Sequence, residues 1–457
     1  MKKWFTASLL TLFVLASVFG SNPATAAGGG SGAQDADADQ NTDVPKNVIY
    51  LIGDGMGVTY NTAYRYYKNG GFSEDMADTE FDHHLVGQQK THPHDEEENI
   101  TDSAASATAM ATGSKTYNNA IAVDHELNEL ETALEVAKAS DKSTGLVATS
   151  EITHATPASF GAHDESRHNH AEIADDYFDE RINDQMKVDV LLGGGIEYFD
   201  REDRNLIEEF QNEGYDFVSN AQEMQQSQNS QLLGLFSEGG LPKKWDRTEE
   251  IPSLESMTQT ALDTLSQNEE GFFLMVEGSQ IDWAGHANDI AGAMSEMEDF
   301  EAAFAAAIDF AEQDGETLVV ATADHNTGGF SLGLDGEYNW NAEPLHEMHR
   351  TPEFITEEIL ETEDIEGTLD AYIDWAFTSE EIGALEEALL LPTADRYGEI
   401  EGIIKGAVDK RTFTGWTTGG HTGEDVNVYA YGPGKENFQG LTDNIEHGDF
   451  IKSFMAQ

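Results

Sequence analysis

Six short runs of aliphatic and β-branched residues alternate with segments of helical periodicity, and this pattern constrains the fold most strongly. Such alternation is typical of an α/β protein built on a mainly parallel sheet. Four of the six runs lead into a carboxylate, a histidine or a threonine. Because the carboxyl ends of parallel strands meet at one edge of a sheet, we expect one composite site there. The runs are residues 47–52, 145–149, 188–192, 272–276, 317–322 and 426–431.

The 457 residues include 87 Asp and Glu against 24 Lys and Arg, which gives a formal charge of −63. This sign excludes a protein that coats nucleic acid, since the phosphate backbone would repel it. Hydrophobic residues still make up 39% of the chain, enough for a core. We expect a globular, salt-adapted protein whose acidic surface is screened by ions. The chain has no cysteine, so any metal must be held by histidine and carboxylate ligands.

Residues 1–26 have the parts of a secretory signal peptide: basic Lys2 and Lys3, an apolar run, and small residues ending near Ala26. A membrane anchor is the alternative, but the apolar run is shorter than the roughly 20 residues that a span requires. Residues 27–45 are rich in Gly, Ser and Asp, which predicts an acidic linker. We therefore expect a periplasmic or secreted protein with no membrane span after signal cleavage.

Residues 331–418 lack the β-branched density of the six runs and contain acidic helical stretches. They separate Asp324 and His325 from His421. We interpret them as an insertion in one domain that spans residues 46–457. The expected fold class is α/β, with a single large, mainly parallel central sheet, helices on both faces and an inserted crown-like segment.

The strongest local signal is a run of small residues from Thr101 to Met110, in which Ser103 would begin a helix. Unpaired N–H groups and the helix dipole favour an anion at such an end. A serine oxygen placed there can attack phosphorus while the helix end holds the phosphate. The alternative is an N-cap serine on a tightly packed helix, and the run by itself favours that alternative.

Asp and His residues at the ends of the strand-like runs predict metal sites. Asp282 and His286 lie four residues apart, on one face if helical, and Asp324 directly precedes His325. One such pair is more often a hydrogen bond than a metal site, but two pairs with further ligands suffice for two zinc-like ions and one harder ion. Two ions about 4 Å apart can stabilise both the entering and the leaving oxygen of a displacement at phosphorus. The further ligands are Asp54, Glu277 and His421.

Six motifs follow one another along the chain. They are Gly53-Asp54-Gly55-Met56-Gly57, Asp102-Ser103-Ala104-Ala105-Ser106-Ala107-Thr108-Ala109, Ala155-Thr156-Pro157, Val276-Glu277-Gly278, Ala323-Asp324-His325 and His421-Thr422-Gly423. In these motifs and their order the chain closely resembles the alkaline phosphatases, over nearly all of residues 48–457. The Asp-Ser-Ala-Ala-Ser sequence is the most specific of them.

The resemblance implies an enzyme that hydrolyses small phosphate monoesters with two Zn²⁺ ions and one Mg²⁺ ion. Ser103 would be the nucleophile and would form a phosphoserine, whose hydrolysis releases inorganic phosphate. Arg167 would clamp two phosphate oxygens, a task that suits a guanidinium fork, and Asp102 would orient it. The implied ligands are Asp282, His286 and His421 for one zinc, Asp54, Asp324 and His325 for the other, and Asp54, Thr156 and Glu277 for magnesium.

His154 and Trp283 occupy positions that vary within the family: some members have Asp beside the magnesium and Lys near the phosphate. An imidazole makes zinc more plausible at the third site. An indole lacks the positive charge of lysine, so we expect weaker retention of phosphate, although Trp283 could simply pack. The remaining histidines match no ligand of the family and include His83, His84, His92, His94, His168, His170, His346 and His349.

Other functions compete with this one. Related metalloenzymes act on phosphodiesters, sulfate esters or phosphoglycerates, but the sulfatases use a modified Cys or Ser in a proline-containing motif that this chain lacks. A non-catalytic, exported cation-binding protein would explain the acidic charge but not the spaced Asp, His and Ser elements. The resemblance also implies a homodimer, with residues 331–418 a candidate for part of the contact.

Overall fold

The computed structural model describes residues 44–71 and 75–457, which belong to one compact unit, Asn41–Gln457. The predicted signal peptide, and the predicted linker up to residue 43, lie outside the described residues. Within the described part, no helix combines the length and the apolar character that crossing a membrane would require.

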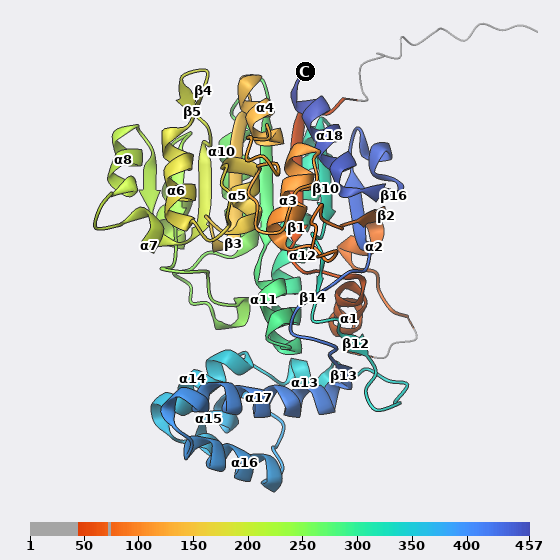
Figure 1. Ribbon diagram of the computed structural model, residues 1–457. Coiled ribbons are helices and arrows are strands. Elements are labelled where there is room, and N and C mark those ends of the chain that lie inside the picture. Colours follow the sequence, from red (N-terminus) through yellow and green to blue (C-terminus); the bar gives the residue numbers. More distant parts are fainter. Residues whose placement is uncertain (1–43, 72–74) are drawn as a thin grey trace, which may run out of the picture. The chain divides into compact units, whose positions relative to one another are not determined.

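A ten-stranded sheet with helices on both faces confirms the predicted α/β class (Figure 1). Its strand order is β16-β2-β15-β10-β1-β9-β3-β6-β8-β7, and β15 alone runs against its neighbours. The strands are β1 (Asn47–Gly53), β2 (Leu85–Lys90), β3 (Ser143–Glu151), β6 (Val190–Gly194), β7 (Asp216–Val218), β8 (Leu232–Leu235), β9 (Phe272–Gly278), β10 (Thr317–Thr322), β15 (Val426–Tyr431) and β16 (Gly440–Asp443).

The direction of β15 was not predicted from the sequence. Residues 426–431 form a strand, as predicted, but β15 is antiparallel to β10, with Val319 opposite Tyr431. Its carboxyl end therefore lies at the edge of the sheet opposite to the carboxyl ends of β1, β9 and β10. The Gly432-Pro433 turn that follows β15 does not join the polar residues at the ends of the parallel strands.

Alternate residues of the central strand β1 supply two separate cores, because successive side chains of a strand point to opposite faces. Ile49 and Leu51 belong to one core, and Val48, Tyr50 and Ile52 to the other, all with 0% exposure. Burial on both faces is typical of parallel sheets and accounts for the near-continuous apolar sequence of the central strands.

Different helices cover the two faces. The first core includes residues from α1 (Val58–Lys68), α10 (Leu254–Leu265) and α12 (Ile290–Asp314). The second core includes residues from α3 (Ser103–Thr112), α4 (Ala133–Ala139), α5 (Ala155–Gly161), α6 (His170–Asp179), α8 (Leu206–Asn212) and α18 (Asn444–Met455). Shorter elements are α2 (Glu80–His84), α7 (Ile196–Phe199), α9 (Ala221–Gln226), α11 (Gln280–His286), β4 (Arg181–Ile182), β5 (Gln185–Met186), β11 (Asn326–Thr327) and β14 (His421–Thr422).

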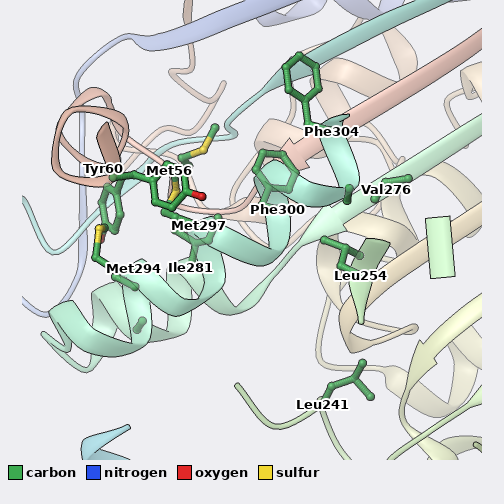
Figure 2. Packing of buried hydrophobic residues seen from close by; sticks show 14 of the residues in the cluster. Met56, Tyr60, Leu241, Leu254, Val276, Ile281, Met294, Met297, Phe300 and Phe304 are labelled. Carbon is green, nitrogen blue, oxygen red and sulfur yellow. The ribbon is translucent and has the colours of Figure 1, made fainter. Parts of the chain in front are cut away.

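Helix α12 packs closely against the strand ends. Figure 2 shows Met297 and Phe300 of α12 grouped with Met56, which follows β1. A Cβ atom at Gly278 would lie 2.8 Å from Phe300 Cδ2, so only glycine at the end of β9 allows this approach. The close contact holds the end of β9 in place, and with it the loop that leads into α11.

Residues 331–418 form a group of helices closed by a two-stranded pairing, in which Ser331 lies opposite Gly415. In Figure 1 these helices lie beyond the carboxyl ends of the strands, on the side of α11. The elements are β12 (Ser331–Leu332), α13 (Glu343–His346), α14 (Pro352–Thr362), α15 (Ile365–Tyr372), α16 (Ser379–Leu389), α17 (Thr393–Thr412) and β13 (Thr414–Gly415).

Candidate active site

The carboxyl ends of β1, β9 and β10 bring distant parts of the chain together. Asp54 directly follows β1, Glu277 lies near the end of β9, and Asp324 follows β10. Beyond the inserted helices the chain returns to this edge, where β14 pairs with β11 and His421 lies opposite Thr327. The resulting side chains form three groups of possible metal ligands, with the ligand atoms of each group within 4.8 Å of one another.

Asp282, His286 and His421 form the first group. His286 Nε2 lies 3.3 Å from Asp282 Oδ2 and 3.1 Å from His421 Nε2. The hydrogen bond with Asp282 raises the pKa of His286 to about 9, whereas burial lowers the pKa of His421 to about 4. Metal ligands must be deprotonated, so a bound cation would take the place of the His286 proton as the partner of Asp282.

Asp54, Asp324 and His325 form the second group and are 0% exposed. His325 Nε2 lies 3.1 Å from Asp324 Oδ2 and 3.5 Å from Asp54 Oδ1. Burial and the charges of Asp324 and Asp282 raise the pKa of Asp54 well above its ordinary value. Two buried carboxylates around one imidazole need positive charge, which a divalent cation would supply. The His325 and His421 rings stack with centroids 3.6 Å apart, so the first two groups are adjacent.

Asp54 also belongs to the third group, which it forms with Glu277 and His154. Among the described residues, no hydrogen-bond partner exists for either carboxylate oxygen of Asp54, for Glu277 Oε1 or for the buried Thr156 Oγ1. Glu277 Oε2, by contrast, accepts a hydrogen bond of 2.7 Å from Ser279 Oγ. Burial raises the pKa of Glu277 to about 7. Oxygen atoms left unpaired in one buried place fit a hard cation.

Ser103 is the first residue of α3 and is 1% exposed. Asp102 caps the helix by accepting a hydrogen bond of 2.9 Å from the Ala105 amide. Ser103 Oγ lies 3.2 Å from His325 Nε2, next to the second ligand group. Every residue of α3 is buried, which explains the run of small side chains: α18 approaches so closely that a Cβ at Gly448 would lie 2.4 Å from the Gly113 amide nitrogen.

Arg167 connects α3 to the third group. Its Nη1 donates to Asp102 Oδ2 at 3.1 Å, and its Nη2 lies 2.9 Å from His154 Nε2. A guanidinium only donates hydrogen bonds, so His154 Nε2 accepts this one. Burial and the neighbouring Arg167 lower the pKa of His154 to about 3, which keeps its imidazole neutral. Arg167 and a cation at the third group would therefore compete for the same nitrogen lone pair.

Trp283 follows Asp282 on α11 and packs edge-on against His154, with ring centroids 5.8 Å apart. The other end of its indole lies against Gly240, where a Cβ would come within 2.5 Å of Trp283 Cη2. Of the two variable positions, His154 thus belongs to the third group and contacts Arg167, and Trp283 contacts His154.

Two features escaped the sequence analysis. Thr327 Oγ1 donates to Asp282 Oδ1 and lies 3.3 Å from His325 Nδ1, so one hydroxyl connects the first and second groups. Its place two residues after His325 was the only available signal. A fourth group of possible ligands, Glu135, His163 and Glu180, lies outside this site and already contacts the buried ammonium of Lys187.

Comparison with known proteins gives one consistent family. The family model described as alkaline phosphatase matches residues 45–457. Alkaline phosphatase 3 of Bacillus subtilis (strain 168) is 58% identical over 449 residues, covering 98% of this chain and 96% of that protein. Alkaline phosphatase 4 of the same organism is 53% identical, covering 89% of this chain and 88% of its own length.

Solved structures agree with this result. The cold-active alkaline phosphatase of the psychrophile Shewanella sp. has a TM-score of 0.84 and 41% identity, and the match covers 90% of this chain and 100% of that one. A histidine-to-aspartate variant of alkaline phosphatase from the Antarctic bacterium TAB5, with Mg bound in its M3 site, has a TM-score of 0.66 and 29% identity, covering 91% and 99%. The family match over residues 45–457, with these relatives, places this chain in the alkaline phosphatase family.

Proposed function

We propose that this phosphomonoesterase transfers the phosphoryl group of its substrate to Ser103 and then hydrolyses the phosphoserine to release inorganic phosphate. One observation carries the proposal: Ser103 Oγ lies at the N-terminus of α3, 3.2 Å from a residue of the second ligand group. A phosphate in front of Ser103 would meet the positive end of the helix dipole. Asp102, the capping residue, also holds Arg167 at this end of the helix.

The ligand chemistry supports two zinc ions in the first two groups and a magnesium ion in the third. Nitrogen and carboxylate donors suit zinc, and the oxygen-rich third group suits magnesium. When bound, such ions supply Lewis acidity and positive charge for displacement at phosphorus. His154 adds a nitrogen donor to the third group, so zinc is an alternative occupant there. The TAB5 variant that carries Mg in its M3 site replaces a histidine with aspartate, which is consistent with this sensitivity.

The protein's own residues would bind and orient the phosphate. Arg167 would bind phosphate oxygens through its N–H donors. Asp102 holds the guanidinium before substrate arrives, and His154 also holds it wherever the His154 lone pair is not taken by a cation. Thr327 positions Asp282 through its hydroxyl, and Ser279 positions Glu277. Preorganised donors of this kind favour the transition state because little reorganisation is needed during the reaction.

Export, salt adaptation and dimerisation belong to the same proposal. We propose export, on the basis of residues 1–26, and adaptation to high salt, on the basis of the charge of −63. We also propose a homodimer. Phosphodiesters and sulfate esters remain the alternative substrates, and a cation-binding protein without turnover is the non-catalytic alternative.

Ser103→Ala tests the nucleophile. In the parent enzyme, labelled phosphate from a monoester should attach to the protein under acid quench, and in Ser103→Ala this label should disappear while the metal content remains. Ser106→Ala is the matched control, since Ser106 lies three residues further along the same buried helix and donates to the Asp324 carbonyl. Labelling of Ser103→Ala at the parental rate would rule out Ser103.

Metal analysis of purified protein tests the ligand groups. His421→Ala should lose zinc together with activity. His346→Ala should lose neither, because His346 stacks on Tyr67 in the inserted segment's contact with the core, away from the ligand groups. Full zinc content in active His421→Ala would contradict the proposed two-zinc site, and hydrolysis of a diester in preference to a monoester would reassign the substrate.

A further inference from the structure

A cavity of about 430 Å³ opens beside the active site, between the core and the inserted helices. One wall comes from α11 and the loop that contains Leu241 and Lys243, and the opposite wall comes from Phe354 and its neighbours on α14. Its volume lies in the range of small-molecule binding sites. No residue of this cavity belongs to the three ligand groups.

Trp283 connects the cavity to the phosphate-binding residues. Its indole lines the cavity and packs edge-on against His154, which accepts the hydrogen bond from Arg167. Two side chains, Trp283 and His154, therefore separate the cavity from the arginine proposed to clamp the phosphate. An organic group attached to that phosphate is the part of a substrate that could extend past Trp283.

The cavity is aromatic and negatively charged. Trp283 and Phe354 supply aromatic surface, with the Arg350 guanidinium 5.1 Å from the Phe354 ring centroid, and Asp246, Glu353 and Glu357 supply carboxylates. The single lysine, Lys243, forms an ion pair with Glu353. Asp246 accepts hydrogen bonds from the Thr351 amide and hydroxyl.

Glu357 is the cavity carboxylate that is available to bind a ligand. It is exposed on α14 and has no hydrogen bond or ion pair with any described residue. Burial and the nearby charges of Glu353 and Asp246 raise the pKa of Glu357, while Lys243 lowers it. An ammonium group would meet the Glu357 carboxylate beside the aromatic wall here, whereas an anion would be repelled.

We propose that this cavity binds the alcohol part of the substrate and selects phosphate monoesters whose organic group carries a protonated amine. The proposal rests on the enzyme's phosphomonoesterase activity and names the leaving-group class that it prefers. Trp283 and Phe354 contact the apolar part of this group, and Glu357 pairs with its ammonium.

Three aryl phosphates with similar phenol leaving groups test the proposal: 4-(2-aminoethyl)phenyl, 4-ethylphenyl and 4-(2-carboxyethyl)phenyl phosphate. kcat/KM should be highest for the amine and lowest for the carboxylate. Methyl phosphate, which is too small to reach past Trp283, monitors the phosphate chemistry alone. Loss of methyl phosphate hydrolysis would mean that the proposed activity has failed, whereas normal hydrolysis with equal kcat/KM for the three aryl esters would overturn the cavity proposal.

The decisive variant is Glu357→Gln, compared with Glu361→Gln. Both residues are exposed on α14, but only Glu357 lines the cavity. The two substitutions change the net charge equally, so comparing them removes the effect of the general attraction of an acidic protein for an amine. Glu357→Gln should reduce the amine-to-ethyl ratio of kcat/KM by about 1.5- to fivefold, the range expected for an exposed ion pair. Glu361→Gln should leave the ratio unchanged.

Phe354→Ala tests the aromatic wall. It should lower kcat/KM for the amine and ethyl esters while methyl phosphate hydrolysis stays at the parental rate. Equal amine-to-ethyl ratios in the parent, Glu357→Gln and Glu361→Gln would overturn the assignment of Glu357, and parental rates for all aryl esters in Phe354→Ala would overturn the binding site.

Discussion

Asp102 performs two tasks that substitution can separate. Its Oδ1 caps α3 by accepting from the Ala105 amide, and its Oδ2 accepts from the Asn119 amide at 3.0 Å and from Arg167 Nη1 at 3.1 Å. Asp102→Ala removes all three interactions. Asp102→Ser removes the Asn119 and Arg167 contacts but retains a side chain that caps helices well. Because both variants lose the Asn119 contact, the difference in their stability reports the cap of α3, and their shared loss of phosphate binding reports the preorganisation of Arg167.

The expected magnitudes follow from these contacts. Loss of an N-cap costs about 1 kcal/mol of unfolding free energy, so Asp102→Ala should be less stable than Asp102→Ser by about that amount. Fixing a free arginine costs about 2 kcal/mol of rotamer entropy. His154 still holds one side of the guanidinium, so we expect both variants to weaken phosphate binding by about 1–2 kcal/mol, or roughly 5- to 30-fold.

Competitive inhibition by inorganic phosphate measures the loss of phosphate binding, and denaturant unfolding of the metal-loaded enzyme measures the loss of stability. KM for a monoester should rise in parallel with the phosphate inhibition constant. The maximal rate need not fall, since weaker retention speeds product release where release limits turnover. An unchanged phosphate inhibition constant in Asp102→Ser would refute the idea that Asp102 preorganises Arg167.

Three more predictions concern the third group, the surface charge and a buried carboxyl. His154→Asp adds an oxygen donor, so magnesium added to metal-depleted protein should activate this variant more than the parent; equal activation would contradict a role for His154 there. The melting temperature should rise as NaCl increases from about 0.1 to 2 M, because ions screen repulsion within a chain of charge −63, and a flat or falling curve would refute salt adaptation. Burial raises the pKa of Asp409 to about 7, although Asp409 accepts a hydrogen bond from Trp416. Its folded form then binds more protons than the unfolded chain between about pH 4 and 7, so it lowers stability as pH rises through this window. Asp409→Asn, which can still accept that bond, should stabilise the protein by about 1–2 kcal/mol at pH 8 and hardly at pH 4, as measured by denaturant unfolding.

The strongly apolar strands could be predicted from sequence, whereas the more polar strand β2, which lies between β16 and β15, could not. β1 and β10 are buried on both faces and read as continuous apolar runs. β2 contains Gly87-Gln88-Gln89-Lys90 and is largely half-buried or exposed, so its composition carries little strand signal. The two-residue period of side chains along a strand is the same for both strand directions. The sequence therefore could not predict that β15 runs antiparallel to its neighbours.

The residues of the site show the same contrast. Some belong to sequence motifs, and others come into the site only through folding. Ser103 and Asp324-His325 belong to motifs, and their expected proximity appears as a 3.2 Å contact between Ser103 Oγ and His325 Nε2. Thr327 contacts both Asp282 and His325, but a lone threonine has no distinguishing pattern. The cavity was equally hidden, since its walls come from three separate segments of the chain, within residues 240–246, 280–283 and 353–357.

The charge of the whole protein and the charge of the cavity act on the same substrate at different ranges. A chain of −63 repels every phosphate ester at long range, and an ammonium on the leaving group reduces that repulsion before binding begins. Salt near 1 M shortens the Debye length to about 3 Å and removes this long-range term. An ammonium in direct contact with Glu357 would lie no further from the carboxylate than about this Debye length. Salt therefore screens the contact incompletely, and part of the cavity's preference should persist. The amine-to-ethyl ratio of the parent should therefore fall with salt toward a plateau above one, and the ratio of Glu357→Gln should fall closer to one. If both ratios reached one at high salt, the preference would belong to the surface charge and not to the cavity.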